Sequence, residues 1–510
     1  LGGPTVRKQA GGGRGRGMRV AVVGAGLGGL SAACHLAGRG HEVVVLERSD
    51  EPGGRVAVVR EGGYTLDIGA TVLTMTGVLA DVFTAAGSCL DDHLVLEAVD
   101  PMYRATFPDA EPILVRHGRE AMTEEIRAKA GAAEAEAFGR FCRWLTELYQ
   151  LEMPNFIDRN FDSPLDLAWP LGPLIGLLRT GALRKLSSVV DGCFGDERLR
   201  KLFSFQAMYA GLSPFDALAV YGVITYMDTV EGVYFPQGGM NAVGRGLADA
   251  ATKAGASIRY GTTVERIVRR PGAGGGAVRG VRLDDGELIL ADAVVANPDL
   301  PVAYRTLLPD VAMPRVARKG EYSPSCALWV AGVRGALPAD AAHHNIHFGG
   351  QWREAFDAIL RRGTRMPDPS ILVTSHSHSD PSLAPPGGAT LYALEPTPNL
   401  DGRIDWVADR DWVRDTLVER VRSHGYPVDE GAIEVERFYD PTDWERMGME
   451  RGTPFGLSHR FFQTGPFRPE NRDERVPGLY FVGSSTVPGV GVPMVLLSGR
   501  LAANRVEGHR

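Results

Sequence analysis

Apolar residues near the start of the chain change from the spacing of a strand to that of a helix. An apolar run from Arg19 to Val23 predicts a strand, a glycine-rich turn follows, and residues 27–37 are compatible with a helix. A second apolar run, from Glu42 to Glu47, predicts another strand. This order of elements predicts a βαβ opening, which is typical of an α/β fold.

Residues 120–150 carry apolar and aromatic residues at helical spacing. Positions Phe138, Phe141, Trp144, Leu145 and Leu148 fall on one face. The segment is therefore predicted to be helical and amphipathic.

The stretch 164–186 is strongly apolar but interrupted. The interrupting residues are Pro170, Gly172, Pro173 and Gly176, and the basic residues Arg179, Arg184 and Lys185 follow them. The prolines and glycines exclude an unbroken membrane-spanning helix. Two alternatives fit the composition equally well. One is an amphipathic element that lies on or dips into a membrane, with basic anchors, and the other is a cap helix packed inside the substrate domain.

Strand patterns return in the middle of the chain and at its end. Between Ala256 and Asn297 the pattern is strand, loop, strand, tight turn and strand, and Asp284-Asp285-Gly286 is a hairpin signal. Residues 301–473 indicate only a mixture of α and β. Residues 478–506 again have the pattern of a strand, a glycine-rich turn and a helix.

Length and composition predict a large core. The chain has 510 residues, of which 44% are hydrophobic and 23% charged, so two or three interwoven domains are expected. Lys and Arg total 55 against 62 Asp and Glu, a net charge of −7. This balance provides no general attraction to nucleic acid or to an anionic bilayer. No nucleic-acid partner is expected, and any membrane contact must be mainly hydrophobic.

Cysteine usage and the start of the chain predict a cytoplasmic protein. Cys34, Cys89, Cys142, Cys193 and Cys326 form no CxxC and no spacing of a zinc site or disulfide framework, so reduced thiols are expected. No apolar run approaches the roughly 20 residues of a spanning helix, and no signal-peptide pattern opens the chain. Residues 1–17, rich in Gly and Arg, are expected to be a disordered leader, with the natural chain starting at Met18.

The first turn has the glycine spacing of a dinucleotide-binding site. Gly24 permits the tight turn, Gly26 lets the backbone approach a pyrophosphate, and Gly29 lets the helix pack close to the sheet with its N-terminus toward the negative charge. Glu47 ends the second strand, where a carboxylate accepts hydrogen bonds from ribose hydroxyls. Strand, glycines, helix and acid together predict dinucleotide binding.

A second glycine-rich turn favours a flavin over a nicotinamide. Arg48 follows the strand, and the run Gly53-Gly54-Arg55 places a cation close to where a flavin pyrophosphate would lie. A nicotinamide enzyme has no use for this extension. The alternative for Arg55 is an ordinary surface salt bridge. Further along, Gly69 and Ala70 permit close approach of the backbone to a flat ring.

A set of longer motifs runs through the chain from Met18 to Val506. They are GAGLGGL, ERSDEPGGR, GGYTLDIGATVLTM, FSFQAMYAGLSPFDA, GVYFPQGGMNAV, AHHNIHFGG, DPSLAPPG and, the most diagnostic, YFVGSSTVPGVGVPMVLLSGRLAA. In these motifs the sequence resembles the bacterial-type phytoene desaturase family of flavoprotein carotenoid desaturases.

The resemblance implies the fold of flavin amine oxidases. A Rossmann-like FAD-binding domain, expected at residues 18–90, 236–300 and 476–510, would be interwoven with an α+β substrate domain at 91–235 and 301–475. The first part of the substrate domain would contain a helical, membrane-associating element. The implied partners are an apolar isoprenoid substrate, the inner face of the cell membrane, and a quinone or oxygen as electron acceptor.

The motifs and the resemblance together assign residues to the FAD site. These residues are Gly24, Gly26, Gly28, Gly29, Glu47, Arg48, Gly54, Arg55, Gly69, Val264, Gly483, Ser484, Gly491, Val492, Pro493 and Met494. The backbone of Val264, in a strand expected to start at Thr262, would meet the adenine. Ser484 follows Gly483 at a position where many flavoproteins of the wider fold have an Asp.

Desaturation of an isoprenoid removes a hydride from one carbon and a proton from its neighbour. FAD accepts the hydride, and a hydrocarbon offers no polar handle, so a long tunnel lined by apolar side chains is expected. The resemblance places Asp166 beside the flavin as the candidate catalytic residue, although the Arg sometimes found after it is absent. The alternative for Asp166 is the N-cap of the coming helix.

Histidines cluster in the second half of the chain. His343, His344 and His347 have no nearby Cys or acidic partner, so a structural role is expected rather than a metal site. The same holds for His376 and His378, which alternate on an expected strand and would share a face.

Two alternative functions stay open. Related proteins isomerise or saturate polyenes with reduced flavin. A prenyl-lipid binding protein of the same fold would carry out no redox chemistry and would not need the flavin fingerprint, which this chain has.

Overall fold

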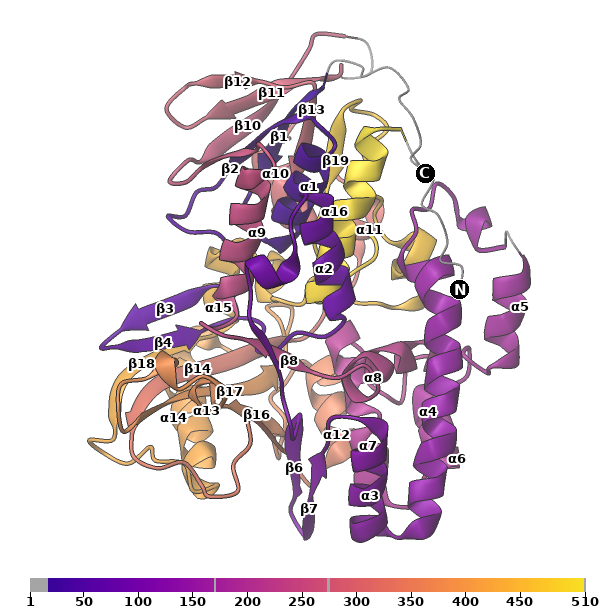
Figure 1. The fold of residues 1–510 in the computed structure, drawn as a ribbon, viewed down its shortest axis with the longest axis vertical. Coiled ribbons are helices and arrows are strands. Elements are labelled where there is room, and N and C mark those ends of the chain that lie inside the picture. The colour runs from indigo at the N-terminus through magenta and orange to yellow at the C-terminus, as the bar shows by residue number, and fades with distance from the viewer. Residues whose placement is uncertain (1–16, 169–170, 273–275, 509–510) are drawn as a thin grey trace, which may run out of the picture.

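A five-stranded parallel sheet forms the framework of the upper part of the molecule in Figure 1. The computed structural model describes residues 17–168, 171–272 and 276–508. The strands come from chain segments far apart in sequence. In sheet order they are β19 (Leu479–Phe481), β13 (Ala293–Ala296), β1 (Arg19–Val23), β2 (Glu42–Leu46) and β9 (Ser257–Arg259).

Successive residues of β1 face two different layers. Val20 and Val22 pack into the core formed with the helices, whereas Ala21 and Val23 pack into the core on the opposite face. Because both faces are covered, the strand is apolar after its exposed first residue, Arg19. The helices on the first face are α1 (Leu27–Gly38), α2 (Thr76–Ala85), α9 (Asn241–Lys253) and α16 (Val492–Val506), and the second face is covered by β10 (Val264–Arg269), β11 (Val278–Leu283), β12 (Leu288–Leu290), α10 (Leu300–Thr306) and α11 (Arg315–Lys319).

A seven-stranded mixed sheet forms the base of a second part of the molecule. In sheet order its strands are β18 (Ile433–Tyr439), β14 (Ser325–Arg334), β17 (Gly388–Thr397), β16 (Ile371–Thr374), β15 (His344–His347), β6 (Tyr103–Phe107) and β7 (Ala110–Val115). Strands β15 and β6 pair in parallel, and the other neighbours are antiparallel. Two small ribbons pair β3 (Val58–Glu61) with β4 (Tyr64–Asp67) and β5 (Leu96–Ala98) with β8 (Tyr234–Pro236).

The helices of this second part lie beside the sheet or pack on one another, and α4 is the longest of them (Figure 1). They are α3 (Arg119–Ala130), α4 (Ala132–Glu152), α5 (Leu171–Arg179), α6 (Leu186–Cys193), α7 (Glu197–Leu202), α8 (Gly222–Thr229), α12 (Trp352–Asp357), α13 (His376–Ser379), α14 (Trp406–Ser423) and α15 (Pro441–Arg446). Short helical turns are η1 (Leu90–Asp92), η2 (Met153–Ile157), η3 (Pro164–Ala168), η4 (Phe205–Ala210), η5 (Ala219–Tyr221), η7 (Ala358–Arg362), η8 (Pro381–Leu383), η9 (Glu450–Gly452), η10 (Phe461–Gln463) and η11 (Gly465–Phe467).

The amphipathic segment at 120–150 forms two helices rather than one. Gly131, with φ +94°, separates α3 from α4, because this backbone conformation is incompatible with a continuous helix. The predicted apolar face is confirmed, since Phe138, Phe141, Leu145 and Leu148 are all buried, and Trp144 is partly buried.

Within the interrupted apolar stretch, α5 packs beside α4 at the edge of the molecule (Figure 1). The exposed apolar side chains of the stretch are Leu165, Leu171, Ile175, Leu178 and Leu183. This exposure fits the surface-lying alternative better than a buried cap helix. Among the described residues, no helix combines the length and the hydropathy needed to cross a membrane.

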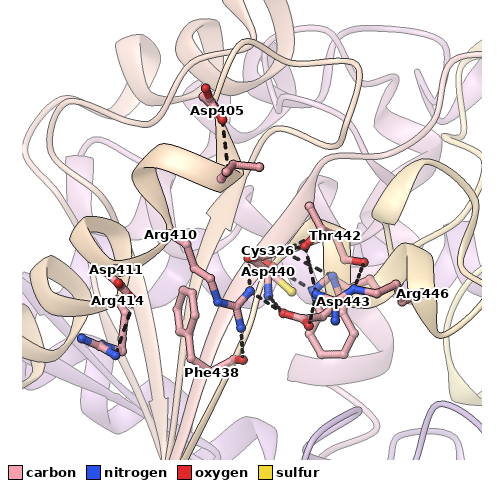
Figure 2. A network of polar contacts seen from close by, with 12 residues as sticks. Cys326, Asp405, Arg410, Asp411, Arg414, Phe438, Asp440, Thr442, Asp443 and Arg446 are labelled. Atoms are coloured by element: carbon pink, nitrogen blue, oxygen red, sulfur yellow. Dashed lines mark hydrogen bonds and ion pairs between the residues drawn. The ribbon is translucent and has the colours of Figure 1, made fainter.

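A polar network fastens α14 to the start of α15 (Figure 2). Arg410 of α14 pairs with Asp440 and donates to Asp443 at 2.7 Å. Asp440 caps α15 by accepting the backbone N–H of Asp443. The Trp444 indole of the same helix donates to the carbonyl of Cys326 in β14 at 2.9 Å. The network therefore positions Trp444, which lines the cavity described below.

Other expectations have mixed outcomes. The expected strand through His376 and His378 is wrong: β16 ends at Thr374 and the histidines lie in the short helix α13, with His376 buried and His378 exposed. Local hydrogen bonds turn the chain there, including His378 N–H to Ser375 O at 3.1 Å. The expected leader falls, apart from residue 17, outside the described residues. All cysteines lie in the described part of the chain and are free thiols.

Candidate functional site

A cavity of about 2010 Å³ lies between the two parts of the molecule. Both ends of the chain line it: the turns after β1 and β2 on one side, and the turn between β19 and α16 on the other. From there the cavity continues between η2, η4, α5, α8 and η10. Most of the predicted cofactor residues line it, although they are spread over 470 positions from Gly24 to Met494.

The first glycine turn packs around the side chain of Asn297, which follows β13. A Cβ atom on Gly26 would lie 2.6 Å from Asn297 Nδ2, and one on Gly28 would lie 3.0 Å from Asn297 Oδ1. A Cβ on Gly29 would lie 2.2 Å from the carbonyl oxygen of Gly24. Gly29 itself packs behind the turn and does not line the cavity. Any larger residue at these positions would fill the turn or push it apart.

The N-terminus of α1 opens toward the cavity. Among the described residues no side chain caps its first turn, and that turn contains no acidic residue. These free N–H groups and the helix dipole suit an anionic pyrophosphate. The buried Glu47 carboxylate accepts the backbone N–H of Ala25 at 2.6 Å and of Ser49 at 2.8 Å. A carboxylate has further lone pairs, so Glu47 can also accept hydroxyl groups of a ribose.

Arg55 connects the two chain ends through Asp299. The guanidinium donates to Asp299 Oδ1 at 2.8 Å and to the hydroxyl of Ser484. Asp299 is buried and also accepts the hydroxyl of Ser485 at 3.2 Å. Gly69 packs directly on the same segment, since a Cβ on it would lie 1.7 Å from the carbonyl oxygen of Arg55. Arg55 is thus part of the cavity wall and not a simple surface residue.

The remaining predicted residues line the cavity from several elements. Gly483 and Gly491 have φ values of +112° and +114°, conformations that favour glycine. Gly491 precedes α16, whose first residues Val492, Pro493 and Met494 all line the cavity. Val264 lines it at the start of β10, which begins at Val264 rather than Thr262. Arg48 lines it too, and donates to the Met447 carbonyl at 2.6 Å.

Asp166 lies in η3 and does not line the cavity. Its Oδ2 atom accepts the backbone N–H groups of Asp162 at 2.8 Å and Ser163 at 3.0 Å. These hydrogen bonds hold a local turn, as in the capping alternative. The catalytic role of Asp166 stays a prediction.

Two carboxyl groups and a histidine that the sequence analysis did not assign to the site lie in the cavity wall. Burial raises the pKa of Asp228 to about 6, and Tyr103 donates to it at 3.1 Å. Burial also raises the pKa of Glu152 well above the usual range of a glutamic acid. His344 is held neutral, because burial lowers its pKa well below the usual value. Its Nε2 has no hydrogen-bond partner among the described residues.

The sequence contained a signal for some of the site residues that the sequence analysis did not assign. Asn297 and Asp299 follow β13, and ligands of α/β folds bind at the carboxyl ends of parallel strands. Glu152 continues the apolar stripe of α4 after Leu145 and Leu148, so it is a carboxyl where the pattern predicts an apolar residue. Asp228 carried no such signal.

The other histidines have structural contacts. His343 pairs with the Ser379 hydroxyl at 2.7 Å, and His347 with the Thr106 hydroxyl at 2.7 Å while it stacks on His424. Within the described ranges, no group of His, Cys, Asp and Glu side chains has the arrangement of a metal site.

Fold and site together define a dinucleotide-dependent oxidoreductase with a long apolar chamber. The chain matches the family of flavin containing amine oxidoreductases over residues 27–507, and it belongs to this family. The expected FAD cofactor and the flavin amine oxidase fold are thereby confirmed.

Relatives and a solved structure agree with this assignment. A phytoene dehydrogenase of Streptomyces griseus is 45% identical, with 96% of this chain and 95% of the relative covered. A zeta-carotene-forming phytoene desaturase of Myxococcus xanthus is 38% identical, with 96% and 94% covered. The crystal structure of cyclohexylamine oxidase from Brevibacterium oxydans has a TM-score of 0.60 at 16% identity, over 96% of this chain and 99% of that one, and shows the shared fold. The resemblance seen in the sequence is confirmed.

Proposed function

We propose that the protein is an FAD-dependent desaturase of a long isoprenoid polyene, phytoene or a related carotenoid intermediate. The observation that carries this proposal is one continuous cavity with two kinds of wall. One end has glycine turns and a helix N-terminus that suit a dinucleotide, and the rest is lined mainly by apolar side chains. The names of the relatives point to the same reaction.

The chain's residues fit FAD at the glycine-lined end. Gly26, Gly28 and Gly54 keep this end closely packed: a Cβ on Gly26 or Gly28 would meet the Asn297 side chain at 3.0 Å or less, and one on Gly54 would lie 3.0 Å from Gly26 Cα. Glu47 would accept the ribose hydroxyls, and Gly491 with Met494 would line the flavin ring. FAD, when bound, supplies a two-electron acceptor. The protein itself orients the substrate and excludes water from the reacting carbons.

A hydrocarbon substrate would be held by burial of its apolar surface. Each Å² removed from water contributes about 25 cal/mol, so a long chamber gains affinity without polar contacts. Leu174, Leu177 and Leu183 line one side, and Phe461 and Phe462 another. Phe462 is 72% exposed and lines the cavity at the same time, so the chamber reaches the surface there.

This opening is proposed to rest on the inner face of the cell membrane, from which the substrate enters. Leu171, Ile175 and Leu178 lie at helical spacing on α5 and are all exposed. Arg184 and Lys185 follow α5, where they would meet lipid headgroups. A quinone dissolved in the membrane, or oxygen, would take up the electrons of the reduced cofactor.

Incubation with phytoene tests the function. FAD-loaded protein, phytoene in liposomes and a soluble quinone are expected to yield products with red-shifted polyene absorption, separated by chromatography. An isomerase would change retention without new conjugation, and a saturase would act only with reduced flavin. A colourless protein that binds no FAD, or phytoene recovered unchanged, would refute the proposal.

Vesicle flotation tests the membrane contact. Replacing Leu171 and Leu178 with aspartate is expected to abolish flotation with liposomes while FAD stays bound. Val407→Asp on α14 is the matched control, because Val407 is 95% exposed but lies on a helix that does not line the cavity. Flotation of the double variant at the level of the unmodified protein would contradict the proposed contact.

A further inference from the structure

The cavity wall contains a carboxyl oxygen that has no hydrogen-bond partner among the described residues. Glu152 is the last residue of α4, is 6% exposed, and lines the cavity. Its Oε1 atom is buried with no hydrogen-bond partner among the described residues. Burying a carboxyl without a hydrogen bond costs the fold stability. The position of Glu152 therefore needs an explanation other than stabilisation.

Tyr221 and His459 connect Glu152 to the terminal glycine turn. Burial is the main cause that raises the pKa of Tyr221 to about 12, and the neighbouring Glu152 adds to it. The Tyr221 hydroxyl donates to the backbone carbonyl of His459. The imidazole of His459 in turn accepts the backbone N–H of Val490 at 3.5 Å. All these residues line the cavity, and Gly491 follows directly.

The apolar contacts of the residue after Glu152 also lie at the cofactor end of the chamber. Met153, the next residue, belongs to one apolar cluster with Ile157, Met227 and Met494. Met494 lies in the first turn of α16, which is proposed to line the flavin ring. The carboxyl thus lies where the apolar chamber meets the proposed cofactor site.

We propose that Glu152 accepts the proton that the substrate loses during desaturation. This inference rests on the proposed function. One substrate carbon would give up a hydride, for which FAD, when bound, would supply the two-electron acceptor. The neighbouring carbon gives its proton to Glu152, and the electron pair of that C–H bond becomes the second bond of the new C=C. Glu152 ends the step as a carboxylic acid and passes its proton to water before the next turnover.

The other carboxyl groups are less suited to this role. Asp228 also lines the cavity, but its Oδ1 accepts the hydroxyls of Tyr103 at 3.1 Å and Thr229 at 3.0 Å. Asp166 does not line the cavity, and backbone N–H groups bind its carboxylate. Burial raises the pKa of Glu152 well above its usual range, so its carboxylate, once formed, is the stronger base. The rate should therefore rise with pH as this carboxyl ionises.

Other ionisable groups face this end of the cavity. Tyr221 of η5 keeps its proton at neutral pH, and burial lowers the pKa of His459 well below its usual value. Arg468, behind them, stays charged with a pKa lowered to about 10 by burial, and binds backbone carbonyls. Asp228 is the remaining cavity group that titrates near neutrality. The pH profile must therefore be compared between unmodified protein and E152Q.

Turnover of two matched variants tests the role. Glu152→Gln keeps size and shape, and is expected to slow desaturation by about 100-fold or more while the bound-flavin absorbance is unchanged. In E152Q the rate of desaturation should also no longer rise with pH, because the variant has no carboxyl to ionise at this position. Glu231→Gln is the control: Glu231 follows α8 and has a buried oxygen without a partner among the described residues, but it does not line the cavity. This control is expected to keep the unmodified rate.

A second readout does not depend on turnover. Dicyclohexylcarbodiimide, an apolar reagent, modifies protonated carboxyl groups in apolar surroundings. Mass spectrometry of peptides from the FAD-loaded protein should find the adduct on Glu152, and squalene should slow its formation. Because E152Q removes an unpaired acid, its thermal midpoint should be equal to or above that of the unmodified protein.

The outcomes separate this inference from the proposed function. If the unmodified protein forms no desaturated product, the proposed function fails and the proton-acceptor role falls with it. If it forms product and E152Q turns over at the same rate, the role alone is refuted. If the reagent does not modify Glu152, the carboxyl is not accessible from the chamber, and the proton-acceptor role is likewise refuted.

Discussion

Replacing Asp299 with alanine is expected to loosen the junction of the two chain ends. Asp299 is 6% exposed, and its Oδ1 accepts Arg55 Nη2 at 2.8 Å and Ser485 Oγ at 3.2 Å. Its Oδ2 accepts the backbone N–H of Glu450 at 3.0 Å. One carboxylate therefore joins the N-terminal turn, the C-terminal turn and the first residue of η9.

The expected loss can be worked out from these contacts. A buried backbone N–H of Glu450 left unpaired costs about 1–3 kcal/mol. The charged hydrogen bond from Arg55 would contribute about 1.5–3 kcal/mol if fully buried. Its side chain is 32% exposed, so water compensates part of that loss. Asp299→Ala should lower the free energy of unfolding by about 2–4 kcal/mol. Asp299→Asn, which keeps an acceptor for Glu450, should lose about half as much.

Urea unfolding followed by tryptophan fluorescence, together with the fraction of FAD retained after gel filtration, measures both effects. Asp310→Ala is the matched control, because Asp310 is 61% exposed in its pair with Arg266 and such pairs contribute about 0–1 kcal/mol. If D299A is no less stable than D310A, or if D299N and D299A are equally unstable, the proposed coupling is wrong.

Three further changes test particular contacts. Gly69→Ala should lower the free energy of unfolding by about 2–3 kcal/mol and release FAD, because its Cβ would lie 1.7 Å from the Arg55 carbonyl oxygen. Gly77→Ala, at an open helical position, is the control and should be neutral or stabilising in the same unfolding assay. Burial raises the pKa of Asp67 to about 7, above its value in the unfolded chain. The stability that protonated Asp67 contributes to the folded state is therefore present at low pH and is lost as pH rises through 7. Relative to Asp67→Asn, the free energy of unfolding of the unmodified protein should fall by up to about 1.4 kcal/mol per pH unit between about pH 4 and 7. If the free energy of unfolding changed with pH in the same way in both proteins, this prediction would be contradicted. Asp166→Asn should lower stability by about 1 kcal/mol with the rate per bound flavin unchanged, and a large fall in that rate would instead support a catalytic Asp166.

Much of the cofactor end could be predicted because its signals are local. The strand before Gly24, the spacing to Gly26 and the acid at Glu47 stand within one βαβ unit, and the hydrogen bond from the Ala25 N–H to Glu47 forms inside that unit. The interruptions in the apolar stretch around α5 were also visible in the sequence, which left open whether the stretch lies on the surface or is packed inside. Sequence reasoning failed at His376, where alternating Ser and His carry no apolar periodicity to distinguish a strand from a turn.

By itself, the sequence determined the flavin fingerprint, the apolar substrate class and the family. Only the tertiary structure decided that Asp299 joins the two ends and that Glu152 faces the chamber. The physical reason is that a side chain's partners and its burial depend on elements brought together from distant parts of the chain. Periodicity shows which face of a helix a residue occupies. It does not show whether that face meets apolar side chains, as Leu148 does, or an open chamber, as Glu152 does.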